Sequence, residues 1–199
     1  IIQMKLSTFE AIGDKSPLFK NKKVALSSFL PNDIIYWAHL PANGSNCKEE
    51  TLSEHLDLVM TYFLRIAEAN HLDEIVDNLI CKIVRVQNKE LCESIKTLFF
   101  NVILYHDFGK VNHLFQENRM KNHNPNIKKI EHRFEHQHSA LGAHLFVIHN
   151  LNDEGNDLLD YITLCLAYPI IKHHAPTLKF LYEDFSLWKN ADSFYQYLA

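Results

Sequence analysis

The chain has 199 residues, of which 47% are hydrophobic and 22% charged, and this balance is typical of a folded globular domain rather than of a disordered chain. Only five glycines and six prolines are present, which disfavours a turn-rich β-sandwich and favours helices. The net charge of −4 excludes a histone-like polycation, so nucleic acid could contact the chain only through a local basic patch.

In chain order, residues 1–30 show no clear periodicity, and the first strong pattern is an amphipathic helix over 51–72. Its start carries Thr51 and Glu54 at the spacing of a capping box. A second helix is predicted over 72–86 and a third over 89–120. The centre of the third, "LFFNVILY", is apolar nearly all round, which predicts burial in the middle of the domain.

The second half of the chain continues the helical pattern. Residues 117–137 are polar and basic, and we expect a loop of solvated surface rather than a DNA-binding element. Further helices are predicted over 138–151, over 158–176 with a kink at Pro169, and in the tail. No stretch has a convincing strand pattern. The expected fold class is therefore all-α, a single-domain helical bundle over 1–199 with a central buried helix that carries a His-Asp motif.

The cysteine pattern and the hydropathy indicate the cellular compartment in which the protein is expected. The four cysteines form no CxxC pair and are scattered at Cys47, Cys81, Cys92 and Cys165. This pattern argues against a zinc finger or a disulfide framework and favours a reducing compartment. No signal peptide is evident, and no apolar run reaches the roughly 18–20 residues that a membrane span needs. We therefore expect a cytoplasmic protein.

Histidine is the outlier of the composition, with thirteen copies. One histidine beside an aspartate lies at the end of the apolar run, in "HDFGK", and others lie beside separate predicted helices. This set comprises His55, His106, His138, His173 and His174, together with Asp107. Helical proteins build metal sites by converging side chains from several helices. The carboxylate of Asp107 could touch one metal ion or bridge two, whereas a lone histidine on an apolar helix is usually only structural.

The motifs resemble those of the HD superfamily of metal-dependent phosphohydrolases, and more narrowly the HD nuclease of type I CRISPR systems. The resemblance runs in family order through "YWAHL" (36–40), "TLSEHL" (51–56), "HDFGK" (106–110), "HSALGA" (138–143) and "KHH" (172–174). It implies that His55, His106 and Asp107 hold a first metal ion. Asp107, His138, His173 and His174 would hold a second ion, and Lys110 would contact the scissile phosphate. His39 would line the site.

The resemblance also implies a function and partners. The chain would hydrolyse phosphodiester bonds of single-stranded DNA with a metal-activated water, alongside a superfamily-2 helicase, fused or separate, and an RNA-guided surveillance complex. Imidazole-rich ligands favour Mn, Fe, Co, Ni or Zn over Mg and Ca. The family expects one more aspartate late in the chain, for which Asp192 is a better candidate than Asp184. The absence of a GxxxxGK[ST] loop leaves a fragment of a longer nuclease–helicase chain as one interpretation.

Two other functions stay open from the sequence. An HD phosphohydrolase acting on nucleotides or cyclic dinucleotides would share the metal ligands, although the GYP motif of the cyclic-dinucleotide branch is absent. A binding module with an inactive site would need no convergent ligand set, so the six ligands argue against it. The phosphohydrolase would differ from the nuclease in the substrate that it hydrolyses. The binding module would differ in failing to bind a metal ion.

Overall fold

A computed structural model describes residues 4–26, 30–31, 34–41, 48–84, 88–127, 138–151 and 156–174. The expected all-α class is confirmed, since helices account for most of the described chain. The described residues also contain two antiparallel pairs of strands, each strand two or three residues long, which the sequence did not predict. None of the described helices has the length and apolar character needed to cross a membrane.

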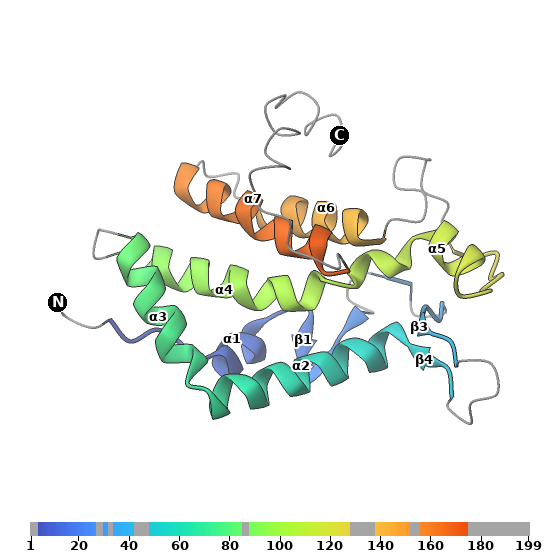
Figure 1. The fold of residues 1–199 in the computed structure, drawn as a ribbon, viewed down its shortest axis with the longest axis horizontal. Coiled ribbons are helices and arrows are strands. Elements are labelled where there is room, and N and C mark those ends of the chain that lie inside the picture. Colours follow the sequence, from blue (N-terminus) through green and yellow to red (C-terminus); the bar gives the residue numbers. More distant parts are fainter. Residues whose placement is uncertain are drawn as a thin grey trace.

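The helix α4 (Lys89–Tyr105) forms the centre of the molecule, with α6 and α7 on one side and α1 and α2 on the other (Figure 1). Its buried side chains include Ile95, Phe100 and Leu104, each at most 1% exposed. This confirms the prediction of a central buried helix. The His-Asp motif follows directly, because His106 is the C-terminal cap of α4.

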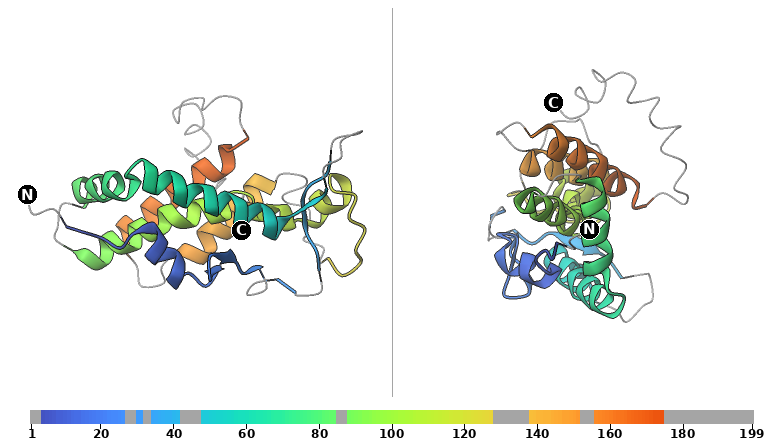
Figure 2. Two further views of the ribbon diagram at one scale, coloured as in Figure 1. Left: turned by 90° about the horizontal axis from the view of Figure 1, so that it is seen from below. Right: turned by 90° about the vertical axis from the view of Figure 1, so that its left-hand side faces the viewer.

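The helix α2 (Leu52–Ala69) begins with the predicted capping box. The Thr51 hydroxyl accepts from the Glu54 N–H at 3.2 Å, and the Glu54 carboxylate accepts from the Thr51 N–H at 2.9 Å. The helix ends at Ala69 with Asn70 as its cap, and His71 takes a left-handed conformation (φ 53°) that turns the chain into α3 (Leu72–Ile83). In the end-on view α3 stands across the end of the bundle (Figure 2).

The single helix predicted over 89–120 is wrong. The chain breaks after Tyr105 into the 3₁₀ turn η2 (Phe108–Val111) and the short helix α5 (His113–Asn118). The Asn112 side chain caps α5 by accepting from the Leu114 N–H at 2.9 Å. The cause of the break is tertiary, because η2 packs closely against α6 (His138–Asn150).

The helix α7 (Asp157–Lys172) packs beside α6 and also contacts α4. Asn156 caps its start by accepting from the Leu159 N–H at 3.1 Å. The helix continues through Pro169 to Lys172, and His173 is its C-terminal cap. Thus the ends of α4 and α7 and the start of α6 lie near η2 (Figure 1).

The N-terminal region holds elements that have no sequence periodicity. The helix α1 (Phe9–Lys15) is capped by Thr8, and the strands β1 (Phe19–Lys20) and β2 (Lys23–Val24) pair next to it. The strands β3 (Trp37–His39) and β4 (Glu50–Thr51) pair just before α2, with His39 opposite Glu50. This second pair brings His39 to the same end of the molecule as His55.

Candidate metal centre

Asp107 lies in the turn between α4 and η2, and its carboxylate is buried. A buried carboxylate is costly unless cations or hydrogen-bond donors surround it. The six residues of the predicted ligand set converge here, because every predicted histidine has its Nε2 atom within 4 Å of a carboxylate oxygen of Asp107. The structure therefore brings together side chains from α2, α4, α6 and α7.

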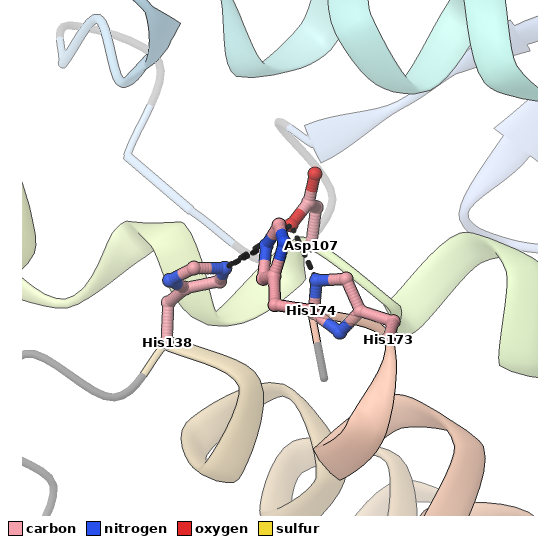
Figure 3. Close-up of side chains that lie close together, drawn as sticks. All are labelled: Asp107, His138, His173 and His174. Carbon is pink, nitrogen blue, oxygen red and sulfur yellow. Dashed lines mark hydrogen bonds and ion pairs between the residues drawn. The ribbon is translucent and has the colours of Figure 1, made fainter. Parts of the chain in front are cut away.

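The two oxygens of Asp107 face different partners. We call His138, His173 and His174 the Oδ1 group, because their Nε2 atoms lie 3.4, 3.1 and 3.9 Å from Oδ1 (Figure 3). We call His55 and His106 the Oδ2 group, because their Nε2 atoms lie 2.9 and 3.3 Å from Oδ2. A carboxylate with a separate imidazole set on each oxygen can bridge two metal ions.

Close packing of two glycines brings the Oδ1 group to Asp107. A Cβ added at Gly109 would lie 1.8 Å from the His138 carbonyl oxygen and 2.5 Å from the Gly142 nitrogen. A Cβ at Gly142 would lie 2.8 Å from the Tyr105 carbonyl oxygen. The glycines of "HDFGK" and "HSALGA" thus let η2 and the first turn of α6 touch backbone to backbone, which carries His138 to the carboxylate.

Three of the five imidazoles are held with Nε2 facing Asp107 by contacts of their other nitrogen. The Nδ1 atoms of His106 and His173 lie 2.8 and 2.6 Å from the carbonyl oxygens of Ile103 and Ile170. A carbonyl only accepts, so both Nδ1 atoms carry the proton. The Nδ1 of His55 lies 3.3 Å from the Glu50 carboxylate. The carbonyl contacts fix the tautomer of His106 and His173 that leaves Nε2 directed at a metal ion.

The donor atoms fit a cation better than they fit one another. If Nδ1 carries the only ring proton of His106 and His173, their Nε2 atoms can only accept, as the facing carboxylate does. The buried Nε2 of His55 makes no hydrogen bond although it lies 2.9 Å from Oδ2. The Nε2 atoms of His138 and His174 are 2.9 Å apart. A divalent metal ion within each group would satisfy these atoms.

The electrostatics of the site also suit metal binding. Burial alone would raise the pKa of Asp107, but contacts with His106, His138, His173 and His55 outweigh it and hold the pKa far below its usual range. Burial, followed by the neighbouring His173 and His138, lowers the pKa of His174. An ionised carboxylate and a neutral imidazole are the forms that bind metal ions.

Lys110 lies inside the site, with its side chain only 3% exposed. Its Nζ atom is 3.0 Å from Asp107 Oδ2 and 3.2 Å from His39 Nε2. His39 Nδ1 in turn lies 2.6 Å from Glu50 Oε2. The ammonium therefore ends in the cluster itself, and the predicted contact of Lys110 with a scissile phosphate stays a prediction.

Glu50 is the residue of this site that the sequence did not indicate. It contacts both His39 and His55, and the three side chains have donor atoms close enough to hold a metal ion themselves. Lys110 can only donate, so His39 Nε2 accepts and His39 Nδ1–H donates to Glu50. Glu50 consequently supports the ring orientation of His55 and His39 rather than adding a third site.

Several predicted residues lie outside the described part of the chain. They are the two candidates for a last aspartate ligand and three basic residues of the predicted loop: Asp184, Asp192, Lys128, Lys129 and Arg133. Of the same loop, Arg119 is the C-terminal cap of α5 and Lys121 donates to the Asn118 carbonyl at 2.9 Å. Cys47 also lies outside the described residues, and the three described cysteines are free thiols.

Comparison with known proteins identifies no relative of this chain. No protein-family model matches the chain, and neither the curated proteins nor the solved structures contain a significant match.

Proposed function

We propose that this chain is a metal-dependent nuclease of the HD type that cuts single-stranded DNA in a type I CRISPR interference system. One observation carries the proposal: each carboxylate oxygen of Asp107 faces its own set of imidazole Nε2 atoms. Divalent ions held in this way supply charge neutralisation at a phosphodiester and an acidified water nucleophile. No nucleophilic side chain is then required.

The chain's own residues would hold and orient the centre. Asp107 would supply a carboxylate to both sides of the centre, and the five histidines would supply nitrogen ligands, of which His106 and His173 have their tautomers fixed by backbone carbonyls. Nitrogen-rich ligand sets prefer Mn, Fe, Co, Ni or Zn over Mg. We therefore expect activity with transition metals and little with magnesium.

The exposure of the site supports a polymeric substrate over a small one. The side chain of His174 is 59% exposed and that of His39 is 52% exposed, so both edges of the centre reach the surface. A nucleotide hydrolase normally encloses most of its ligand. The preference for a single strand, and a superfamily-2 helicase and an RNA-guided surveillance complex as partners, rest on the motif resemblance alone.

The decisive experiment measures which of several substrates the purified chain hydrolyses. Labelled single-stranded and double-stranded DNA, nucleotides and cyclic dinucleotides are incubated with Mn²⁺, Co²⁺, Ni²⁺, Zn²⁺, Mg²⁺ or EDTA. Asp107→Ala tests the centre, and Glu68→Ala, an exposed carboxylate on α2, is the matched control. We expect single strands to be cut only with transition metals, by the wild type and by the control.

Three results would contradict the proposal. Cleavage by Asp107→Ala would place the activity outside this centre. Hydrolysis of nucleotides or cyclic dinucleotides with DNA left intact would support the phosphohydrolase alternative, which uses the same ligands. Failure to bind any divalent metal would leave a binding module as the better description.

A further inference from the structure

The two halves of the centre are not equivalent in their donor atoms. The Oδ1 group offers three imidazole nitrogens and one carboxylate oxygen, all within 4.8 Å of one another. Four donors of this kind make a complete tetrahedral site for a first-row transition metal. Among the described residues the Oδ2 group offers only three donors, namely two imidazole nitrogens and one oxygen.

The halves differ also in charge. Lys110 places a positive ammonium 3.0 Å from Oδ2, the oxygen that a metal ion on this side would share. At 3% exposure the ammonium has almost no water to screen it, and buried like charges repel strongly. Lys110 forms its ion pair with Asp107 at Oδ2, whereas the contacts of Oδ1 are with the imidazoles of the Oδ1 group.

Lys110 is held in this position by two further side chains. His39 Nε2 accepts from the ammonium at 3.2 Å, and Glu50 accepts from His39 Nδ1 at 2.6 Å. The chain from Glu50 through His39 therefore keeps the positive charge against Oδ2. In effect the ammonium already satisfies the oxygen that a second metal ion would need.

We propose that the centre binds one metal ion tightly in the Oδ1 group and a second only weakly in the Oδ2 group, because Lys110 competes with it for Asp107. This inference rests on the metal-binding part of the proposed function and is independent of whether DNA is the substrate. It makes Lys110 a positioning residue that controls how many ions the centre holds.

Titration of the metal-free full chain with Mn²⁺, followed by calorimetry and by electron paramagnetic resonance, tests the inequality. We expect one ion with an affinity at least about tenfold above that of the second. Lys110→Met removes the charge and keeps the apolar stem, so it should tighten the second site by about tenfold or more and bring the two ions into magnetic contact. Lys82→Met, an exposed lysine on α3, is the control and should change neither affinity.

A second pair of variants tests the inequality without altering Lys110. His174→Ala removes an exposed ligand of the Oδ1 group and should abolish the tight site. His106→Ala removes a ligand of the Oδ2 group and should leave the tight site unchanged. Loss of the tight site in His106→Ala, or no change of the second site in a folded Lys110→Met, would overturn the inference.

The titration also separates failure of this inference from failure of the proposed function. Two ions of equal affinity in the wild type would overturn the inference and leave the metal centre standing. No bound ion in the wild type would overturn both. One tight and one weak ion, with the expected response of the variants, supports the inference even if DNA is not cut.

Discussion

At the scale of single residues, Gly109 decides whether the ligands can meet. A methyl group there would lie 1.8 Å from the His138 carbonyl oxygen, which is backbone and cannot rotate away. We predict that Gly109→Ala lowers the free energy of unfolding by about 3 kcal/mol and abolishes metal binding, because α6 must move away from η2. Denaturant unfolding and metal titration measure the two effects.

Gly13→Ala is the matched control for this prediction. A Cβ at Gly13 would lie 2.9 Å from a ring carbon of Phe19 and 3.0 Å from one of Phe100, and side chains can shift where backbone cannot. We expect a smaller loss of about 1 kcal/mol and unchanged metal binding. Equal effects of the two substitutions on metal binding would show that the glycine contact does not position His138.

Gln116 is a second buried residue whose substitution should change the structure of the site. Its amide accepts from the Trp37 N–H at 2.9 Å and donates to the carbonyls of Trp37 and Lys110 at 2.9 and 2.7 Å. It thereby joins β3, which carries His39, to η2, which carries Lys110. Gln116→Met should cost about 1–3 kcal/mol of stability, because buried backbone groups lose their partners.

Hydrogen exchange gives the more specific readout for Gln116→Met. The Trp37 amide should exchange much faster in the variant, while the amides of α3 should exchange at the wild-type rate relative to global unfolding. Unchanged protection of Trp37 would contradict the role assigned to Gln116.

At the scale of elements, one lysine in α4 holds α3 and the N-terminal segment. Lys96 is fully buried, and its Nζ lies 2.6 Å from Asp77 and 2.8 Å from Asp73. These two carboxylates in turn accept from the backbone N–H groups of Leu6 and Phe9 at 3.2 and 2.9 Å. Removing the ammonium would leave the buried Asp77 carboxylate and the partly exposed Asp73 carboxylate without this counter-ion.

We therefore predict that Lys96→Met destabilises the fold by about 3–5 kcal/mol. Lys22→Met is the control, because Lys22 Nζ lies 2.6 Å from Glu10, the same distance that separates Lys96 Nζ from Asp77. The side chains of Lys22 and Glu10 are mostly exposed, whereas Lys96 is buried. Solvent screens an exposed pair of this kind, so Lys22→Met should lose far less stability than Lys96→Met. Equal losses in the two variants, measured by urea unfolding, would contradict the assignment of Lys96 as an internal anchor.

The elements also show what the sequence can predict. Apolar spacing and the Thr51–Glu54 capping box are local signals, and they predicted α2 with its first turn correct. The break after Tyr105 has only weak local signals, namely Gly109 and the Asn112 cap, and the contact of Gly109 with α6 stabilises it. Strands of two or three residues have no periodicity to detect, so the pairing of His39 with Glu50 could not be predicted either.

The same distinction holds for the site. Residue chemistry and motif order indicated the five histidines and Asp107, and these side chains do converge. Neither could indicate Glu50, whose contacts depend on the β3–β4 register, or the burial of Lys110. The resemblance implied a Lys110 ammonium that faces a phosphate, whereas in the structure its Nζ lies against Asp107 and His39.

At the scale of the whole molecule, a metal ion at Asp107 would link helices that are far apart in sequence. The ligands come from α2, the end of α4, the start of α6 and the end of α7, so an ion that binds only the folded chain stabilises their packing. At a metal concentration one hundred times the dissociation constant, the gain in unfolding free energy is about 2.7 kcal/mol.

We therefore predict that Mn²⁺ or Zn²⁺ raises the melting temperature of the metal-stripped chain by several degrees and that EDTA reverses the rise. Protection against hydrogen exchange should increase in the last turn of α7 and the first turn of α6, which carry the Oδ1 group, and not in α3, which carries no ligand. His174→Ala should remove the thermal shift, because an exposed ligand can be lost without disturbing the core. A shift of equal size in that variant would mean that the ion stabilises the molecule from another site.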